Sequence, residues 1–264
     1  MLGSAFNFDT MLSRFHSHSA IAPPVVEPVP TVFPRIEGAD IAAVFVAKRI
    51  AGDFYDSIRV SPERVLIALL DVAGRREDTR GLLVAEQEVF RTFGLKLFSP
   101  ADINESEAMT ELCHRINRRL IEVCCGIHSC PAFLACYHQE FGTLCYTNAG
   151  HTPALLHDAS GIAELASTGL PLGLFSHATS DAPTVALAKK ASLLLVSRGV
   201  IECEGRGNSS SPFGLERAKD VLQGSAPFPS ANALCNSVLK AVADYTGNAP
   251  VCDDRTALAL LRTV

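Results

Sequence analysis

Aspartates stand at the ends of apolar, strand-forming segments in three separate parts of the chain: Asp53 with Asp56, Asp71, and Asp253 with Asp254. The run 65–70, just before Asp71, is apolar throughout and rich in strand-forming residues, so it predicts a buried central strand. An ionised carboxylate is costly to bury beside such a strand unless a cation compensates its charge. Carboxylate oxygens are the ligands that hard divalent cations prefer. Aspartates that converge at one end of a sheet therefore indicate a hard-cation site.

The elements that must position these aspartates are predicted from turn residues and from the spacing of apolar residues. The stretches 44–60 and 64–72 carry the first strands, and Pro62 suits the turn between them. Apolar residues at helical spacing predict helices at 82–97 and 109–123. Further strands are expected at 132–139, 143–149, 153–157, 162–166, 192–197 and 256–262, with a helix after the N-cap Ser230. Many antiparallel strands with segregated helices predict an α+β sandwich.

The chain has 264 residues, of which 48% are hydrophobic and 19% charged, which indicates one sizeable globular domain or two small ones. The first 35 residues differ from the rest, because the proline-rich stretch 22–30 is typical of an extended linker. Residues 6–18 form either a short amphipathic helix or an unstructured tail. A homodimer formed through them is a hypothesis. We therefore predict a tail and linker over 1–35 and one folded domain over 36–264.

Several classes of protein are disfavoured by composition. No apolar run reaches eighteen residues, so we expect no membrane span, and no basic segment followed by an apolar core predicts a secretory signal. The net charge of -5 argues against a nucleic-acid partner. The nine cysteines include Cys124, Cys125 and Cys130 around His128, but no Cys-x-x-Cys pair of the kind common in zinc sites. Reduced, buried cysteines are the favoured interpretation, and they predict a cytoplasmic location.

Six short motifs follow one another in a fixed order along the chain. They are Gly-Asp-Phe-Tyr-Asp at 52–56, Asp-Val-Ala-Gly at 71–74, Thr-Asn-Ala-Gly-His-Thr-Pro at 147–153, Gly-Leu-Pro-Leu-Gly at 169–173, Phe-Gly-Leu-Glu-Arg at 213–217 and Asp-Asp-Arg-Thr at 253–256. From about residue 36 to residue 264 the chain resembles the stage II sporulation protein E branch of the metal-dependent type-2C (PPM) serine/threonine phosphatases.

The resemblance implies a four-layer αββα sandwich of two antiparallel sheets, with two Mn2+ or Mg2+ ions at one end. A metal-bridging water would attack the phosphorus directly, in keeping with two-metal hydrolysis. Carried over by motif, Asp71 would bridge both ions, Asp53 and the Val72 carbonyl would bind one ion, and Asp253 the other. Two further aspartates are candidates for supporting these ligands from behind: Asp56 and Asp254.

The resemblance also implies a substrate. The phosphoserine or phosphothreonine would belong to a signalling protein, an anti-sigma-factor antagonist in a bacterial partner-switching pathway. For His151 we favour a structural role in a turn over a role as general acid. A cysteine-dependent phosphatase is excluded, because the Cys-x5-Arg spacing from Cys113 to Arg119 lies inside a predicted helix and lacks the glycines of a phosphate loop.

The chain departs from the family pattern at two places. The family usually has Thr-Asp-Gly-Val where this chain has Ser-Arg-Gly-Val at 197–200, so Arg198 replaces an aspartate that ligates a metal. A guanidinium cannot ligate a cation, because it has only donors and stays charged. The second departure places Arg75 and Arg76 where relatives have His-Gly. These arginines either hold substrate phosphate or are solvated loop residues, and both interpretations stay open.

These observations lead to one structural hypothesis and two functional ones. The Arg198 guanidinium is expected to lie between Asp71 and Asp253 as a substitute for one metal, which leaves one ion or none. The chain is then either a phosphatase with impaired activity or a degenerate phosphatase domain that binds a partner without turnover. Metal stoichiometry and hydrolysis distinguish these two functions.

Overall fold

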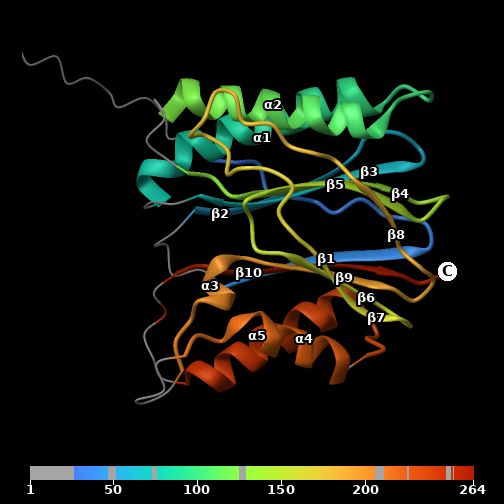
Figure 1. Cartoon of the computed structure of the whole chain (residues 1–264), viewed down its shortest axis with the longest axis vertical. Helices are drawn as coiled ribbons and strands as arrows, with labels where there is room; N and C mark the ends of the chain where they lie inside the picture. Colours follow the sequence, from blue (N-terminus) through green and yellow to red (C-terminus); the bar gives the residue numbers. More distant parts are fainter. Residues whose placement is uncertain are drawn as a thin grey trace, which may run out of the picture.

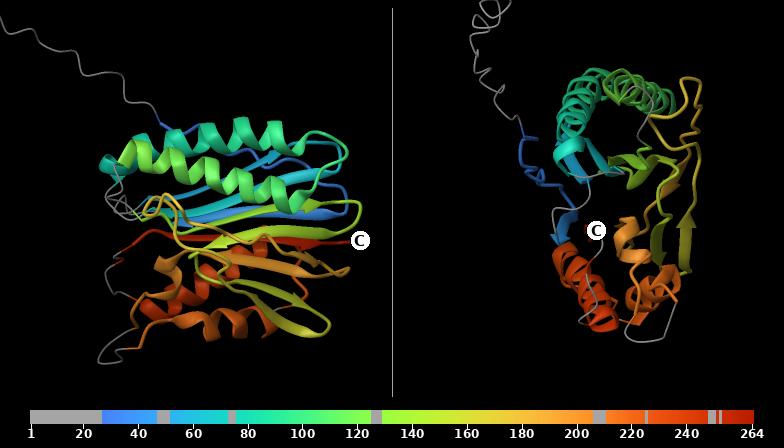
Figure 2. Two further views of the ribbon diagram at one scale, coloured as in Figure 1. Left: turned by 45° about the horizontal axis from the view of Figure 1, so that its top comes forward. Right: turned by 90° about the vertical axis from the view of Figure 1, so that its left-hand side faces the viewer.

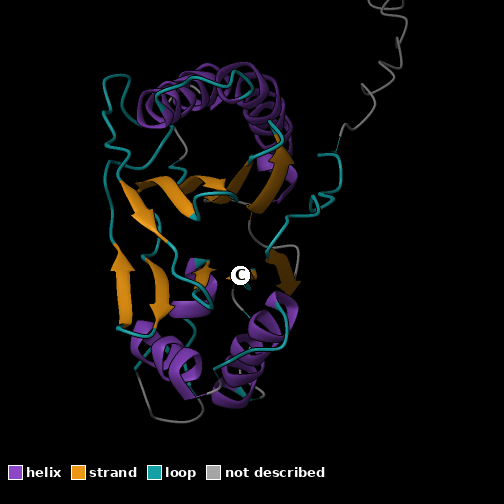
Figure 3. Cartoon of the chain, turned by 90° about the vertical axis from the view of Figure 1, so that its right-hand side faces the viewer, coloured by secondary structure: helices purple, strands orange, loops and turns teal. Residues whose placement is uncertain are grey.

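The computed structural model describes residues 27–46, 52–72, 76–124, 129–205, 211–224, 226–247, 251 and 253–264. Two antiparallel five-stranded sheets face each other, and helices cover the outer face of each sheet (Figure 1). Figure 2 shows these layers from two further directions. In Figure 3 the strands lie between the two groups of helices. The predicted α+β fold, a four-layer αββα sandwich, is confirmed.

The first sheet contains the hairpin that carries two of the predicted site aspartates. Its strand order is β2 (Gly52–Arg59), β3 (Arg64–Val72), β4 (Ala132–His138), β5 (Thr143–Ala149) and β8 (Thr184–Ala186). All residues of β3 are buried, as its apolar run predicts. Ser61 fixes the turn before β3, because its hydroxyl accepts hydrogen bonds from the N–H groups of Glu63 (3.2 Å) and Arg64 (3.1 Å). The resulting register places Asp53 directly opposite Asp71.

The second sheet contains the first and the last of the described strands. Its strand order is β1 (Ala39–Val46), β10 (Arg255–Arg262), β9 (Ser192–Val196), β6 (Ala154–Asp158) and β7 (Gly161–Leu165). The stretch 44–60 divides between the sheets, because β1 pairs with β10 while β2 pairs with β3. The two sheets therefore bring the start of β10 to the same end of the sandwich as the β2–β3 aspartates.

Five helices complete the described elements. Helices α1 (Arg76–Phe98) and α2 (Glu105–Cys124) cover the first sheet, α4 (Gly214–Gly224) and α5 (Ala231–Thr246) cover the second, and the short α3 (Arg198–Ile201) follows β9 (Figure 1). Ser230 caps α5 as predicted, since its hydroxyl accepts a hydrogen bond from the Ala233 N–H at 3.1 Å. Helices α1 and α2 begin earlier than predicted. Their first turns are largely polar, so the spacing of apolar residues does not mark them as helical.

Apolar side chains fill three layers, one between the sheets and one under each pair of helices. Alternation along β3 sends Ile67 and Leu69 into the layer between the sheets, and Leu66 and Leu70 into the layer under α1 and α2. Burying a large apolar side chain stabilises the fold by about 1.5–3 kcal/mol. Because Asp71 follows the alternation of Ile67 and Leu69, its side chain belongs to the face between the sheets.

The described cysteines behave as small apolar residues. Cys113, Cys130, Cys136, Cys145 and Cys235 are buried thiols, and Cys203 is half-buried. The zinc alternative at Cys124, Cys125 and His128 falls on side chains outside the described residues. In the part of the chain that the structure describes, no helix combines the length and apolar character needed to cross a bilayer.

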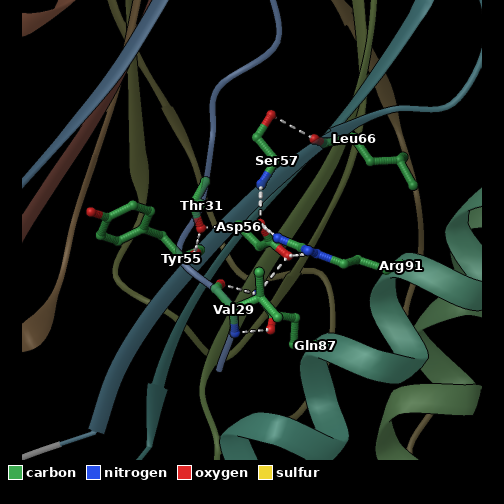
Figure 4. Close-up of polar contacts among 8 residues, drawn as sticks. All are labelled: Val29, Thr31, Tyr55, Asp56, Ser57, Leu66, Gln87 and Arg91. Carbon is green, nitrogen blue, oxygen red and sulfur yellow. Dashed lines mark hydrogen bonds and ion pairs between the residues drawn. The ribbon is translucent and has the colours of Figure 1, made fainter. Parts of the chain in front are cut away.

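The segment 27–35, which we call the N-terminal strap, lies against α1 and β2 (Figure 4). Its Val29 exchanges two hydrogen bonds with the Gln87 side chain of α1. Further along, Phe33 stacks on Tyr55 of β2, with ring centroids 6.0 Å apart. The sequence predicts an extended linker here, and the structure adds that the strap is fixed to the domain.

Candidate active site

The β2–β3 hairpin holds two carboxylates side by side. Asp53 and Asp71 are opposite each other in the ladder, and Asp71 is buried. Directly opposite residues in a sheet have neighbouring side chains, so the backbone itself sets the spacing of this pair. The hydroxyl of Thr256, the second residue of β10, donates a 2.6 Å hydrogen bond to Asp53 Oδ2. The pair is therefore tied to the second sheet.

The two carboxylates interact strongly because they are close and largely shielded from water. Burial, and then the charge of Asp71, raise the pKa of Asp53 to about 8, although hydrogen bonds from Ser197 and Thr256 act in the opposite direction. A like charge and a loss of hydration both disfavour the ionised carboxylate. This pair has the electrostatic character of a site that a cation would stabilise.

The turn from β9 into α3 forms the facing wall of the site. The main-chain N–H of Arg198 donates to Asp71 Oδ2 at 3.2 Å, and the Thr256 N–H donates to Ser197 Oγ at 3.0 Å. Gly199 has no room for a side chain, because a Cβ there would lie 2.0 Å from the Asp254 carbonyl oxygen. The close approach of two backbones at Gly199 holds the α3 turn against the segment that carries Asp253 and Asp254.

The guanidinium of Arg198 lies between two of the predicted metal ligands. Its Nη2 atom is 3.7 Å from Asp71 Oδ1 and 3.6 Å from Asp253 Oδ2. Its Nε atom is 3.8 Å from a carboxylate oxygen of Glu202. The side chain is 43% exposed, so it lies at the mouth of the site and is not enclosed by it. A fixed positive charge thus faces Asp71 and Asp253 together.

Asp253 and Asp254 approach the site from the start of β10. Burial raises the pKa of Asp253, and the Asp71 charge adds to this, whereas the Asp254 N–H and Arg198 lower it. The Asp254 N–H donates to Asp253 Oδ1 at 2.9 Å, and the charge of Asp254 contributes to the raised pKa of Asp53. The structure therefore brings four of the predicted aspartates into one neighbourhood: Asp53, Asp71, Asp253 and Asp254.

Asp56 does not join this group, contrary to its predicted supporting role. Residues three apart on a strand point to opposite faces, so Asp56 faces α1 while Asp53 faces the second sheet. Asp56 is fully buried and binds Arg91, with Nε–Oδ2 at 2.7 Å and Nη2–Oδ1 at 3.0 Å (Figure 4). Gln87 and Thr31 add hydrogen bonds at 3.2 and 3.1 Å. Asp56 joins strap, strand and helix.

The predicted phosphate-binding arginines cannot be placed. Arg75 and the side chain of Arg76 lie outside the described residues.

His151 has the surroundings of a structural residue. Burial lowers the pKa of its ring, and its Nδ1 atom is 3.0 Å from the Thr152 carbonyl oxygen. Its main-chain N–H donates to Asn148 Oδ1 at 2.8 Å, while the Asn148 amide donates to the Leu165 carbonyl at 3.1 Å. These bonds close the turn after β5. A neutral, buried imidazole in this turn agrees with the structural role favoured from the sequence.

Two hydroxyl residues of the site were not predicted. Ser197 and Thr256 each flank a predicted residue and bond across the gap between β9 and β10. The sequence signals them only by their positions: Ser197 directly precedes Arg198, and Thr256 lies two residues after Asp254.

The family model for stage II sporulation protein E (SpoIIE) matches residues 61–263, most of the chain. The chain belongs to the SpoIIE family. The resemblance drawn from the six motifs is confirmed, and the domain is of the PPM phosphatase class.

Known proteins and solved structures agree with this assignment. Protein IcfG of Synechocystis is 20% identical over 89% of this chain and 39% of its own length. Phosphoserine phosphatase RsbP of Bacillus subtilis is 25% identical over 59% of this chain and 38% of its own. The chain thus spans less than half the length of these curated relatives.

Two solved structures share the SpoIIE-family fold closely. The RsbU and RsbW domains of Rv1364c from Mycobacterium tuberculosis give a TM-score of 0.70 at 23% identity, covering 87% of this chain and 61% of that one. The SiaA-PP2C domain of Pseudomonas aeruginosa gives a TM-score of 0.69 at 18% identity, covering 83% of each chain. At these identities the structural likeness supports the fold alone.

The SpoIIE-family domain offers one set of donors that fits a hard cation and one that does not. Asp53 and Asp71 are adjacent carboxylates, and with the Val72 carbonyl they supply oxygen ligands only. Between Asp71 and Asp253, however, stands the Arg198 guanidinium. Among the described residues, no three His, Cys, Asp or Glu side chains are grouped to hold a metal ion. The oxygen donors of Asp53, Asp71 and Val72 suit a hard cation in kind, and the guanidinium excludes a cation from the space between Asp71 and Asp253.

Proposed function

We propose that this SpoIIE-family domain hydrolyses phosphoserine or phosphothreonine on a signalling protein, with an activity that Arg198 impairs. Support for the substrate class comes from RsbP, which is itself a phosphoserine phosphatase, and from the RsbU and RsbW domains of Rv1364c. By family resemblance, the phosphoprotein is an anti-sigma-factor antagonist in a bacterial partner-switching pathway. The reduced thiols of the described residues agree with a cytoplasmic location. Homodimerisation through residues 6–18 stays a prediction.

Asp53, Asp71 and the Val72 carbonyl would hold one Mn2+ or Mg2+ ion, with Asp253 beside them. A bound divalent cation acidifies a water molecule and neutralises charge on phosphoryl oxygens. The chain's own residues orient the carboxylates, since the Thr256 hydroxyl fixes Asp53 and the Arg198 N–H fixes Asp71. Such contacts from behind hold ligands in place and tune them.

The observation that carries the proposal is the guanidinium between Asp71 and Asp253. An arginine in place of an aspartate changes the local charge from negative to positive, and the change of two units equals the charge of one divalent ion. Like charges a few ångströms apart repel strongly at a partly buried site. The second cation of the family is therefore disfavoured, and hydrolysis that depends on two cations is weakened.

The same observation favours a second candidate function. If the remaining cation does not support turnover, the domain is a degenerate phosphatase that recognises a phosphorylated partner and retains it. The two functions share the fold and the ligand class, and they differ only in whether phosphate is released.

Titration of Mn2+ by calorimetry, with hydrolysis of a phosphoserine peptide in parallel, tests the proposal. One bound ion with slow turnover supports the impaired phosphatase, and one ion without turnover supports the binding function. Arg198→Asp is expected to bind a second ion and to raise hydrolysis. Two ions and fast turnover in the unaltered protein would show that Arg198 does not occupy a metal position.

A further inference from the structure

We propose that Arg198 is a phosphate-binding residue, so that its guanidinium and one cation on Asp53 and Asp71 together hold the phosphoryl group. This proposal rests on the function proposed above and adds a substrate-binding role for the side chain that takes the place of a metal. The ligand class is a phosphate monoester or the orthophosphate released from it.

The guanidinium is held by ion pairs that are longer than ordinary hydrogen bonds. Its distances to Asp71, Asp253 and Glu202 are 3.7, 3.6 and 3.8 Å, all beyond hydrogen-bond length. A guanidinium carries five N–H donors in a planar fork that matches two oxygens of a phosphate. The Nε atom of this fork is buried without a hydrogen-bond partner, and 43% of the whole side chain is exposed, so the residue can be reached from solution.

The backbone of Arg198 is fixed even though its terminal group is free to bind. Its N–H is bonded to Asp71 Oδ2, and the next residue, Gly199, is pressed against the Asp254 carbonyl. An ordinary surface arginine has no such anchor beside buried carboxylates. The fork therefore has a defined origin next to the position where Asp53 and Asp71 would hold a cation.

The local charge predicts that phosphate binding needs the cation. Three carboxylates surround the guanidinium, on β3, on the segment before β10 and directly after α3: Asp71, Asp253 and Glu202. These outweigh one positive charge, so a phosphate dianion would be repelled from the cation-free site. One divalent cation on Asp53 and Asp71 would offset two of the negative charges and would itself offer a position for a phosphate oxygen. Arg198 then supplies the second positive group that a phosphoryl dianion requires.

The expected behaviour separates Arg198 from a merely structural residue. Arg198→Ala should still bind one Mg2+, because Asp53 and Asp71 are intact, but it should bind orthophosphate about tenfold more weakly or worse, as for loss of a charged hydrogen bond. Arg198→Lys keeps the positive charge but lacks the planar pair of donors, so its phosphate affinity should lie between those of the unaltered protein and Arg198→Ala. Arg115→Ala is the control, since Arg115 is exposed on α2 and paired with Glu111.

The experiment is calorimetric titration of orthophosphate into the full chain, with and without saturating Mg2+, after a separate Mg2+ titration. The proposal predicts that one Mg2+ binds per chain and that phosphate binds only when Mg2+ is present. Phosphate affinity should decrease from the unaltered protein to Arg198→Lys and then to Arg198→Ala. Equal phosphate affinity in Arg198→Ala, with one Mg2+ still bound and an unchanged circular dichroism spectrum, overturns the role of Arg198 but leaves the proposed function standing. Absence of any Mg2+ binding in the unaltered protein overturns both.

Discussion

Gln87 binds both main-chain polar groups of Val29. The Val29 N–H donates to Gln87 Oε1 at 2.7 Å, and the Gln87 amide donates to the Val29 carbonyl at 2.8 Å. The same amide nitrogen lies 3.2 Å from Asp56 Oδ2, so one side chain of α1 joins the N-terminal strap to β2 (Figure 4). Because Gln87 is buried, water cannot easily replace these bonds.

Gln87→Ala is therefore expected to lower the free energy of unfolding by about 1–3 kcal/mol, the cost of leaving buried polar groups without partners. It should also expose the strap to proteolysis near residue 29. Urea denaturation and limited proteolysis measure the two effects. Glu88→Ala, at an exposed position of the same helix, is the matched control and should change neither. A strap that stays protected in Gln87→Ala would contradict the fixed attachment.

Glu86 makes stability depend on pH. It lies on the inner side of α1 and is fully buried, and this burial raises its pKa to about 8 even though the Cys130 thiol donates to its Oε1 at 3.2 Å. A carboxyl whose pKa is higher in the folded than in the unfolded state contributes stability that is complete below the unfolded value, near 4.5, and is lost as pH rises through the folded value.

Glu86→Gln keeps the shape of the side chain and removes its titration. The difference in melting temperature between this variant and the unaltered protein should grow from pH 5 to pH 8, in favour of the variant, and then level off. Glu88→Gln makes the same chemical change at an exposed position, and its difference should stay flat. Parallel pH curves for Glu86→Gln and the unaltered protein would refute the assignment.

Gly199 is required for the close approach of two backbones. Gly199→Ala would place a Cβ 2.0 Å from the Asp254 carbonyl oxygen, and the α3 turn must shift to relieve the overlap. We expect a stability loss of about 1–3 kcal/mol, typical of overpacking, together with weaker Mg2+ binding. Gly224→Ala has open space around the new methyl group and serves as the control. Denaturation and calorimetry would count against this view if both glycine variants behaved alike.

The sequence predicts the parts of the site that depend on local chain. The apolar run of β3 and the turn at 61–64 predict that Asp53 and Asp71 lie on neighbouring strands, and the family motifs predict that Asp253 lies near them. The direction of Asp56 was also accessible, since a spacing of three residues on a strand means opposite faces. The motif alone groups Asp56 with Asp53, whereas the alternation of side chains along β2 separates them.

Other contacts join residues that are distant in the chain, and no local pattern predicts them. Thr256 and Asp53 are separated by 203 residues, and Gln87 and Val29 by 58. The division of 44–60 between the two sheets also depends on a distant partner, because β1 pairs with β10 near the opposite end of the chain. These features follow from how the sheets stack, which is decided by the whole core.

The ladder between β2 and β3 has a consequence for how this site can vary. The separation of Asp53 and Asp71 is set by paired backbones, and this pairing does not involve the side chain of residue 198. Residue 198, by contrast, lies in the short turn after β9, and its side chain can be acidic or basic without changing the β2–β3 ladder. The sandwich therefore fixes two carboxylates, Asp53 and Asp71, and leaves the third contact to the side chain of residue 198. A single substitution at residue 198 changes whether that contact is acidic or basic, and with it the charge of the ligand that the site favours.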